Sequence, residues 1–208
     1  MQSSNLVHVI DDDDAVRQSL AFLLQTARIG VRTYESAAAF LAALPGVDPG
    51  CIVTDVRMPG MSGIDLLRRL KELKTAMPVI VITGHGDIQL AVEAMKIGAV
   101  DFIEKPFDDE VLLAAVKAAL GQWEKSVWKE AERARLAERL AALSNREREV
   151  LEGLVAGKPN KMIAFDLGIS PRTIEIYRAH VMTKMNAESL SDLVRMALLS
   201  GVLKASDE

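Results

Sequence analysis

The sequence is poor in cysteine and has no apolar run long enough to cross a membrane. Its 208 residues include one cysteine, Cys51, which excludes an internal disulfide and fits a reducing compartment. Unbroken apolar stretches such as Val79–Ile82 fall far short of the roughly 20 residues that a spanning helix needs. No N-terminal stretch has the basic, apolar and small-residue order of a signal peptide. These absences predict a cytoplasmic protein without a membrane partner.

The two ends of the chain differ in charge. Residues 1–122 have a net charge of −5 and residues 123–208 a net charge of +1, within a total of −4. The stretch Lys158–Lys184 alone carries +3. The acidic N-terminal part and the locally basic C-terminal part indicate two different functions. With half of the residues apolar, the length allows one or two domains with a sizeable core.

Short apolar strands alternate with amphipathic helical patterns over the first 120 residues. Since these strands are continuous apolar runs, each is expected to be buried on both faces of a sheet. Repeated strand–helix units predict a doubly wound α/β domain with a parallel sheet, whose ligand site lies at the carboxyl ends of the strands. The expected strands are Leu6–Ile10, Val31–Tyr34, Ile52–Thr54, Val79–Thr83 and Val100–Ile103. Helical patterns lie at about 14–28, 36–44, 63–73 and 88–97, and a fifth begins near residue 109.

The rest of the chain is predicted to be helical. Residues 123–142 contain no Gly or Pro and are rich in Ala, Leu, Glu, Lys and Arg, so we expect a semi-rigid helical linker. Residues 144–203 contain three or four short helical patterns and no strand. We therefore predict an α/β domain at 1–122 and an all-α four-helix domain at 143–208, joined by the linker.

Five polar residues converge on one edge of the predicted sheet. Asp11 and Asp12 follow the first strand, Asp55 ends the third, Thr83 ends the fourth and Lys105 follows the fifth. All five lie at carboxyl ends of parallel strands, although nearly a hundred residues separate the first from the last. Carboxylates crowded in this way repel one another, so the edge is expected to attract a cation.

The expected chemistry of this edge is phosphoryl transfer. Its carboxylates, with the backbone carbonyl of Arg57, are oxygen ligands that suit Mg²⁺. The Asp55 carboxylate can attack phosphorus to give an acyl phosphate, with the metal and Lys105 offsetting the charge. Taken singly, each residue has an ordinary alternative: the run Asp11–Asp14 suits a helix cap and first turn, with Asp14 as the cap. Their placement at one edge favours a site.

Residues 160–185 are predicted to form two helices joined by a tight turn. Gly168 can adopt the left-handed conformation that ends the first helix, and Ser170 and Pro171 suit the cap and first position of the second. An exposed helix with basic ends fits reading of the DNA major groove, although a solvated charged helix is the alternative. We expect Ile174, Tyr177, Val181 and Met185 to face inward. The outward set is Arg172, Thr173, Glu175, Ile176, Arg178, Ala179 and Lys184.

The first domain resembles the receiver domain of two-component response regulators in the segments HVIDDDDAVR, IVTDVRMPGMSGIDLL, VIVITGHGD and AVEAMKIGAVDFIEKPF. The resemblance covers residues 4–120 and implies a flavodoxin-like sheet with strand order 2-1-3-4-5. It implies that Asp55 is the phosphoacceptor, that Phe102 is a switching aromatic, and that the Lys105–Pro106 peptide bond is cis. The implied Mg²⁺ ligands are Asp11, Asp12, Asp55 and the Arg57 carbonyl, and the implied phosphoryl contacts are Thr83 and Lys105.

The C-terminal region, LSNREREVLEGLVAGKPNKMIAFDLGISPRTIEIYRAHVMTKMNAESLSDLVRMAL, resembles the LuxR-type helix–turn–helix of the NarL/FixJ subfamily. The resemblance implies that the helix after ISPRT enters the major groove. Tyr177 stands where relatives commonly have His. The final helix, Leu190–Leu203, is implied to be a core helix that can also serve as a dimer contact. The implied base-edge residues are Glu175, Ile176 and Ala179, and those nearer phosphates are Lys158, Lys161, Arg172, Arg178 and Lys184.

Together these features predict a DNA-binding transcriptional regulator, not an enzyme, that a histidine kinase phosphorylates on Asp55. The segments ITGHGD, AMKIGAVDFIEKPF and SPRTIEIYRAHVMTKM favour the FixJ-like branch. That branch implies a FixL-like, haem-based oxygen-sensing kinase, RNA polymerase as a partner, and activation of nitrogen-fixation and microoxic genes. Phosphorylation is expected to draw in Thr83, reposition Phe102 and favour homodimers through residues 88–103.

Two alternatives remain open on the residues alone. A Mg²⁺-dependent phosphatase with Asp55 as nucleophile would need a second acid two residues along, where Arg57 stands. A protein-interaction module would use the C-terminal helices to bind a partner protein instead of DNA. A transition-metal site is not expected, because His8, His85 and His180 lack ligand spacing.

Overall fold

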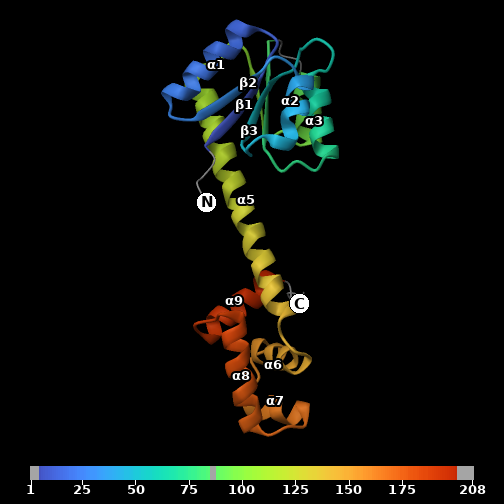
Figure 1. The fold of residues 1–208 in the computed structure, drawn as a ribbon, viewed down its shortest axis with the longest axis vertical. Helices are drawn as coiled ribbons and strands as arrows, with labels where there is room; N and C mark the ends of the chain where they lie inside the picture. The colour runs from blue at the N-terminus through green and yellow to red at the C-terminus, as the bar shows by residue number, and fades with distance from the viewer. Residues whose placement is uncertain (1–4, 85–87, 201–208) are drawn as a thin grey trace. The chain divides into compact units, whose positions relative to one another are not determined.

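The computed structural model describes residues 5–84 and 88–200, and His85 therefore lies outside the described residues. The chain divides into two compact units, Met1–Ser126 and Val127–Glu208, which we describe separately (Figure 1). The division falls within a single helix, α5 (Asp109–Ala141). The predicted domain limits at residues 122 and 143 therefore stay predictions.

The first unit is built on a five-stranded parallel sheet in the order β2-β1-β3-β4-β5, which confirms the predicted fold class. The strand limits differ from those expected by no more than one residue at either end. The strands are β1 (Leu6–Ile10), β2 (Gly30–Tyr34), β3 (Cys51–Asp55), β4 (Val79–Thr83) and β5 (Asp101–Glu104). The three central strands, β1, β3 and β4, are apolar almost throughout, and nearly all of their residues are buried.

The strand register places the candidate site residues along one edge. Ile10, the residue before Asp11, pairs with Thr54, and Asp55 pairs with Ile82. Thr83 pairs with Glu104, the residue before Lys105. Four strands thus end within one residue of each other, which is why side chains far apart in sequence share a site.

Helices cover both faces of this sheet (Figure 1). One core lies between the sheet and helices α1 and α5, and includes Leu24 and Val116. The other lies on the side of α2, α3 and α4, and includes Phe40, Leu66 and Ala94. The helices are α1 (Asp14–Thr26), α2 (Ala37–Ala43), α3 (Gly63–Glu72) and α4 (Ile88–Ile97), with a short 3₁₀ turn η1 (Leu44–Gly46) after α2.

The second unit is all-helical and has its own core. Its helices after α5 are α6 (Asn145–Val155), α7 (Asn160–Leu167), α8 (Pro171–Met185) and α9 (Leu190–Ser200). Leu151, Ile174 and Val181 are completely buried at its centre. The predicted linker is helical, as expected, but it is continuous with the fifth helix of the first unit. Its Leu136 is fully buried in the core of the second unit. Among the described residues, no helix is long and apolar enough to span a bilayer.

The burial of Leu136 gives a test of where the second unit begins. Leu136→Ala should lower the free energy of unfolding of this unit by about 2–5 kcal/mol, because it leaves a cavity in a packed core. Amide exchange in α6 and α8 should accelerate accordingly. Arg135→Ala is the matched control, because the Arg135 side chain is 67% exposed. Equal effects of the two substitutions would show that this turn of α5 is not part of the core.

Candidate functional site

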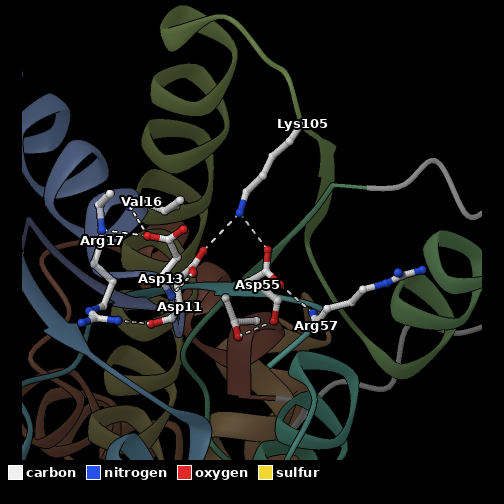
Figure 2. A network of polar contacts seen from close by, with 9 residues as sticks. Asp11, Asp13, Val16, Arg17, Asp55, Arg57 and Lys105 are labelled. Atoms are coloured by element: carbon white, nitrogen blue, oxygen red, sulfur yellow. Dashed lines mark hydrogen bonds and ion pairs between the residues drawn. The ribbon is translucent and has the colours of Figure 1, made fainter. Parts of the chain in front are cut away.

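The structure brings Asp11, Asp55 and Lys105 together at the carboxyl edge of the sheet (Figure 2). The Lys105 ammonium donates to Asp55 Oδ1 at 2.8 Å and to Asp11 Oδ2 at 3.1 Å. Both carboxylates are nearly buried, with side-chain exposures of 5% for Asp11 and 11% for Asp55. One ammonium therefore serves two carboxylates in a poorly solvated site. The Lys105–Pro106 bond is cis, as the resemblance implied.

Burial and this shared contact shift the pKa values of Asp11 and Lys105. Burial raises the pKa of the Asp11 carboxyl above its ordinary value, and the neighbouring charge of Asp55 adds to the effect. The Asp13 N–H and the Lys105 ammonium oppose the shift without cancelling it. Burial lowers the pKa of Lys105, but its hydrogen bonds and charge interactions with Asp55 and Asp11 outweigh this and raise it. Lys105 is thus held firmly in its charged form.

The loop after β3 presents the Asp55 carboxylate. The backbone N–H of Arg57 donates to Asp55 Oδ2 at 2.6 Å, and Gly60 has a φ of +80° in the turn that follows. At Gly63, the first residue of α3, a Cβ would lie 2.1 Å from the Asp55 carbonyl oxygen. Only glycine allows α3 to begin this close to the candidate nucleophile. The sequence pattern had not indicated this role for Gly63.

The acidic run after β1 divides between the site and helix α1. Asp11 faces the site, where its Oδ1 accepts the Asp13 N–H at 2.9 Å. Asp13, and not Asp14 as expected, caps α1 by accepting from the N–H groups of Ala15 and Val16. The expectation was wrong because Asp14 is already the first residue of the helix, so the cap falls one residue earlier. Asp14 instead lies in the first turn and pairs with Arg17 at 2.9 Å.

The other predicted site residues lie around this centre. The exposed Asp12 and Arg57 line one open cavity of about 620 Å³ beside the site. Thr83 is completely buried at the end of β4, and its carbonyl accepts the Lys105 N–H at 2.6 Å. Phe102 is half-buried on β5 opposite Val81 and packs against the core on the α4 side. Direct hydrogen bonds therefore join Asp11, Asp55 and Lys105, and the Thr83 backbone joins them through Lys105, whereas Phe102 packs against the core.

The donor set of this edge fits a hard divalent cation by its chemistry. Asp11, Asp55 and Lys105 together carry a net charge of −1, and Asp12 adds another carboxylate at the rim. Burial is the main cause of the raised pKa of Asp11, and a cation bound here would lower that pKa by favouring the ionised carboxylate. Among the described residues no group of three or more His, Cys, Asp and Glu side chains is arranged at metal-ligand distances. A cation here would thus be held partly by backbone oxygen and water, as Mg²⁺ commonly is.

The second unit contains the predicted helix–turn–helix. Gly168 ends α7 in the left-handed conformation, with a φ of +65°. Ser170 caps α8 by accepting the Thr173 N–H at 3.1 Å, and Pro171 is the first helical residue. These turn signals are confirmed. Of the four residues expected to face inward from α8, three are buried and Tyr177 is half-buried.

The predicted DNA-facing residues are mostly exposed on this helix pair. Arg172, Glu175, Ile176 and Ala179 are exposed on α8, whereas Thr173 and Arg178 are half-buried. Lys161 is exposed in the first turn of α7. Lys158 precedes α7 and its ammonium donates to Asp166 at 2.7 Å.

Lys184 is engaged inside its own domain. Its ammonium donates to Glu147 Oε2 at 2.7 Å and to the Ala142 carbonyl at 3.2 Å. Glu147 is almost fully buried and completes a capping box at the start of α6: Ser144 Oγ accepts the Glu147 N–H, and Glu147 accepts the Ser144 N–H. The hydrogen bond from Lys184 is the main cause that lowers the pKa of Glu147 to about 2. Glu147 was not among the predicted residues, although S-x-x-E is a recognisable cap pattern.

Two family models match the chain. The response regulator receiver domain matches residues 7–117, and the luxR family of bacterial regulatory proteins matches residues 141–197. The chain belongs to the response regulators with a LuxR-type DNA-binding domain. It is therefore a transcriptional response regulator, with a cognate histidine kinase and DNA as partners. Receiver domains generally bind Mg²⁺ at their phosphorylation site.

Known relatives extend this match over the whole chain. The transcriptional regulatory protein FixJ of Azorhizobium caulinodans is 61% identical over 207 residues, covering 100% of this chain and 98% of the relative. FixJ of Rhizobium meliloti is 54% identical, with coverages of 94% and 96%. The crystal structure of full-length FixJ from B. japonicum covers 96% of this response regulator and 98% of that chain, at 56% identity and a TM-score of 0.61. The response regulator StyR gives coverages of 93% and 98%, 38% identity and a TM-score of 0.82.

The low pKa of Glu147 predicts how this LuxR-type domain responds to acid. A carboxyl whose pKa is depressed on folding contributes stability above its unfolded value, which is 4.5, and loses that contribution as the pH falls toward about 2. Glu147→Gln should therefore flatten the decline in stability between pH 4.5 and 2, as measured by urea denaturation followed by the Ile174 methyl signal. Glu149→Gln, at an exposed position on the same helix paired with Arg146, is the control. An unchanged acid dependence in Glu147→Gln would contradict the prediction.

Proposed function

We propose that phosphorylation of Asp55 controls promoter binding by α8. The observation that carries the proposal is the Lys105 ammonium held between Asp11 and Asp55 at the carboxyl edge of the sheet. A carboxylate beside a fixed cation is suited to accept a phosphoryl group, since the cation offsets the charge that arrives. Asp55 is the better acceptor of the two because it ends its strand at the loop, whereas Asp11 lies deeper and is less exposed.

Transfer requires little of the protein beyond placement and charge. A carboxylate oxygen of Asp55 forms a bond to phosphorus as the bond from phosphorus to the kinase's imidazole nitrogen breaks. Lys105 stays protonated throughout and holds a phosphoryl oxygen. The Thr83 hydroxyl donates to another of these oxygens. Mg²⁺, when bound by Asp11, Asp12, Asp55 and the Arg57 carbonyl, would neutralise the remaining negative charge.

The phosphoryl group then acts through β4, β5 and α4. It adds roughly −1.5 to −2 charges to a site that is already short of positive charge. Movement of Thr83 toward it makes room for Phe102 and repositions α4. The face formed by α4 and the start of β5 is apolar and solvent-exposed, which suits a homodimer contact between phosphorylated chains. Its exposed members are Ile88, Val92, Met95 and Val100.

Two DNA-binding domains brought together in this way would read a two-fold symmetric operator. The first turns of α8 lie in the major groove, where Glu175, Ile176 and Ala179 approach base edges. Thr173 lies among them in the first turn. The phosphate contacts are Lys158, Lys161, Arg172 and Arg178. Lys158 would exchange its pair with Asp166 for a phosphate.

The relatives named FixJ support a regulatory setting for this chain. We propose that it activates nitrogen-fixation and microoxic genes together with RNA polymerase, in the cytoplasm. A FixL-like oxygen-sensing kinase is the phosphodonor. The protein has no catalytic task beyond accepting its own phosphoryl group.

Substitution of the acceptor tests the first half of the proposal. Asp55→Asn should abolish labelling by radioactive acetyl phosphate in the presence of Mg²⁺ while leaving the fold intact, because an amide oxygen does not attack phosphorus. Asp14→Asn is the matched control, since Asp14 lies in the same acidic edge region but pairs with Arg17 outside the site. Labelling retained in Asp55→Asn would overturn the assignment of the acceptor.

Salt dependence of DNA binding tests the second half. Lys161→Gln should weaken binding to specific and non-specific duplexes alike and reduce the slope of log K against log salt by about one unit. Lys129→Gln, at an exposed position of α5, should leave the slope unchanged. Fluorescence anisotropy at several KCl concentrations gives both slopes. A wild-type slope in Lys161→Gln would show that this lysine does not contact a phosphate.

A further inference from the structure

The C-terminal end of the proposed recognition helix α8 is held by side chains from two other segments. Glu147, in the first turn of α6, accepts a hydrogen bond from Lys184 at 2.7 Å. Arg139, in the last turn of α5, donates to the Met185 carbonyl at 3.0 Å. Lys184 also donates to the Ala142 carbonyl. A cation at the last carbonyls of a helix is favourable, because these carbonyls have no partner within the helix.

Glu147 is not free to release its lysine. Its side chain is 5% exposed, and the oxygen that accepts from Lys184, Oε2, also accepts the Ser144 N–H at 2.7 Å, while Oε1 lies 3.6 Å from His180 Nδ1. If Lys184 turned to a DNA phosphate, it would leave a buried carboxylate without its cation. That loss outweighs the small gain of one solvent-exposed phosphate contact. Lys184 is therefore better placed to hold α8 than to touch DNA.

We call the contacts of Lys184 with Glu147 and the Ala142 carbonyl, and of Arg139 with the Met185 carbonyl, the clamp. Because a helix is rigid, a change of angle at the clamp displaces the opposite end of α8 most. Arg172 and Lys184 are twelve residues apart on α8, which is roughly 18 Å along the helix axis at 1.5 Å per residue. A tilt of about 5° at the clamp would move the first turn by about 1.5 Å at that radius. Base-edge hydrogen bonds tolerate much less than this, since they weaken steeply outside about 2.7–3.2 Å. A small change in the angle of α8 after loss of the Glu147 contact would therefore displace the first turn by more than its hydrogen bonds to bases tolerate.

We propose that Glu147 is a positioning residue for DNA reading, which acts through Lys184 to fix the angle at which α8 presents its first turns. Lys184 belongs to this clamp and is not a phosphate contact, so its predicted place among the DNA-contacting residues changes. The inference rests on the proposed contact of α8 with the major groove. It goes beyond that contact by naming residues that control sequence discrimination without touching DNA.

The test compares two readouts on the full-length chain at 10 °C after treatment with acetyl phosphate and Mg²⁺. One probe is a duplex selected by the wild-type chain from a randomised library, and the other is a scrambled duplex of the same composition. Anisotropy titrations over a range of KCl give the ratio of the two affinities and the salt slope. The variants are Glu147→Gln, Lys184→Gln, the double variant and Lys184→Arg. Glu149→Gln is the matched control, because Glu149 forms an exposed ion pair on the same helix.

Glu147→Gln and Lys184→Gln should each lower the ratio of specific to non-specific affinity by about tenfold, the loss expected when one base contact is misaligned. The double variant should be no worse than either, since both act through one contact. The salt slope should stay at the wild-type value in all of them. Lys184→Arg should restore most of the discrimination, and Glu149→Gln should match the wild type.

Two results would overturn the inference. A slope lower by about one unit in Lys184→Gln, with a raised affinity in Glu147→Gln, would make Lys184 a phosphate contact. If the folded variants discriminate between the two duplexes as the wild type does, and only their melting temperature is lowered, the clamp has a purely structural role. If Glu147→Gln does not fold, Lys184→Gln and Lys184→Arg decide between these outcomes. Failure of the wild-type chain to select any duplex would instead contradict the proposed function.

Discussion

The candidate phosphorylation site depends on one ammonium group shared between two carboxylates. Lys105 reaches Asp55 and Asp11 from the loop after β5, and the pairing exists only because β1, β3 and β5 end at the same level. Burial raises the pKa of Asp11 in spite of the Lys105 contact. With two carboxylates to one ammonium, the three side chains carry a net negative charge. Such an edge favours further positive charge, as a receiver needs before it can accept a phosphoryl group. The parallel sheet places these side chains together, and their net negative charge favours the binding of a cation.

A second buried carboxylate–lysine pair, in the other unit, behaves in the opposite way. Glu147 accepts hydrogen bonds from the Lys184 ammonium and from the backbone N–H of its capping box, so its pKa falls to about 2. Asp11 shares its cation with Asp55, and burial raises its pKa. Both pairs join a carboxylate to a lysine ammonium, at 3.1 Å for Asp11 and 2.7 Å for Glu147. Burial outweighs the lysine contact at Asp11, whereas the hydrogen bonds from Lys184 and the Ser144 N–H outweigh burial at Glu147.

Much of the first unit could be predicted, because its signals are local. Buried strands are continuous apolar runs, and polar residues directly after them must share an edge. The helix–turn–helix could be predicted for the same reason, because Gly168 and Ser170 are residue types typical of a helix C-cap and a helix N-cap. The cap of α1 was misplaced by one residue, because Asp13 and Asp14 are chemically identical and only geometry separates them. The continuity of α5 was missed because helix formers without Gly or Pro do not reveal where one core ends and another begins.

Pairing within the second unit was beyond sequence reasoning for a different reason. The count of five basic residues between Lys158 and Lys184 treats each as available to DNA. The fold pairs Lys158 with Asp166 and Lys184 with Glu147, an acid that lies outside the counted stretch. In the proposed complex Lys158 leaves its exposed pair with Asp166 for a phosphate, whereas Lys184 stays with Glu147, so four of the five basic side chains supply electrostatic contacts. What Lys184 loses as an electrostatic contact it supplies as a constraint on α8, so its charge contributes to specificity through the angle of the helix.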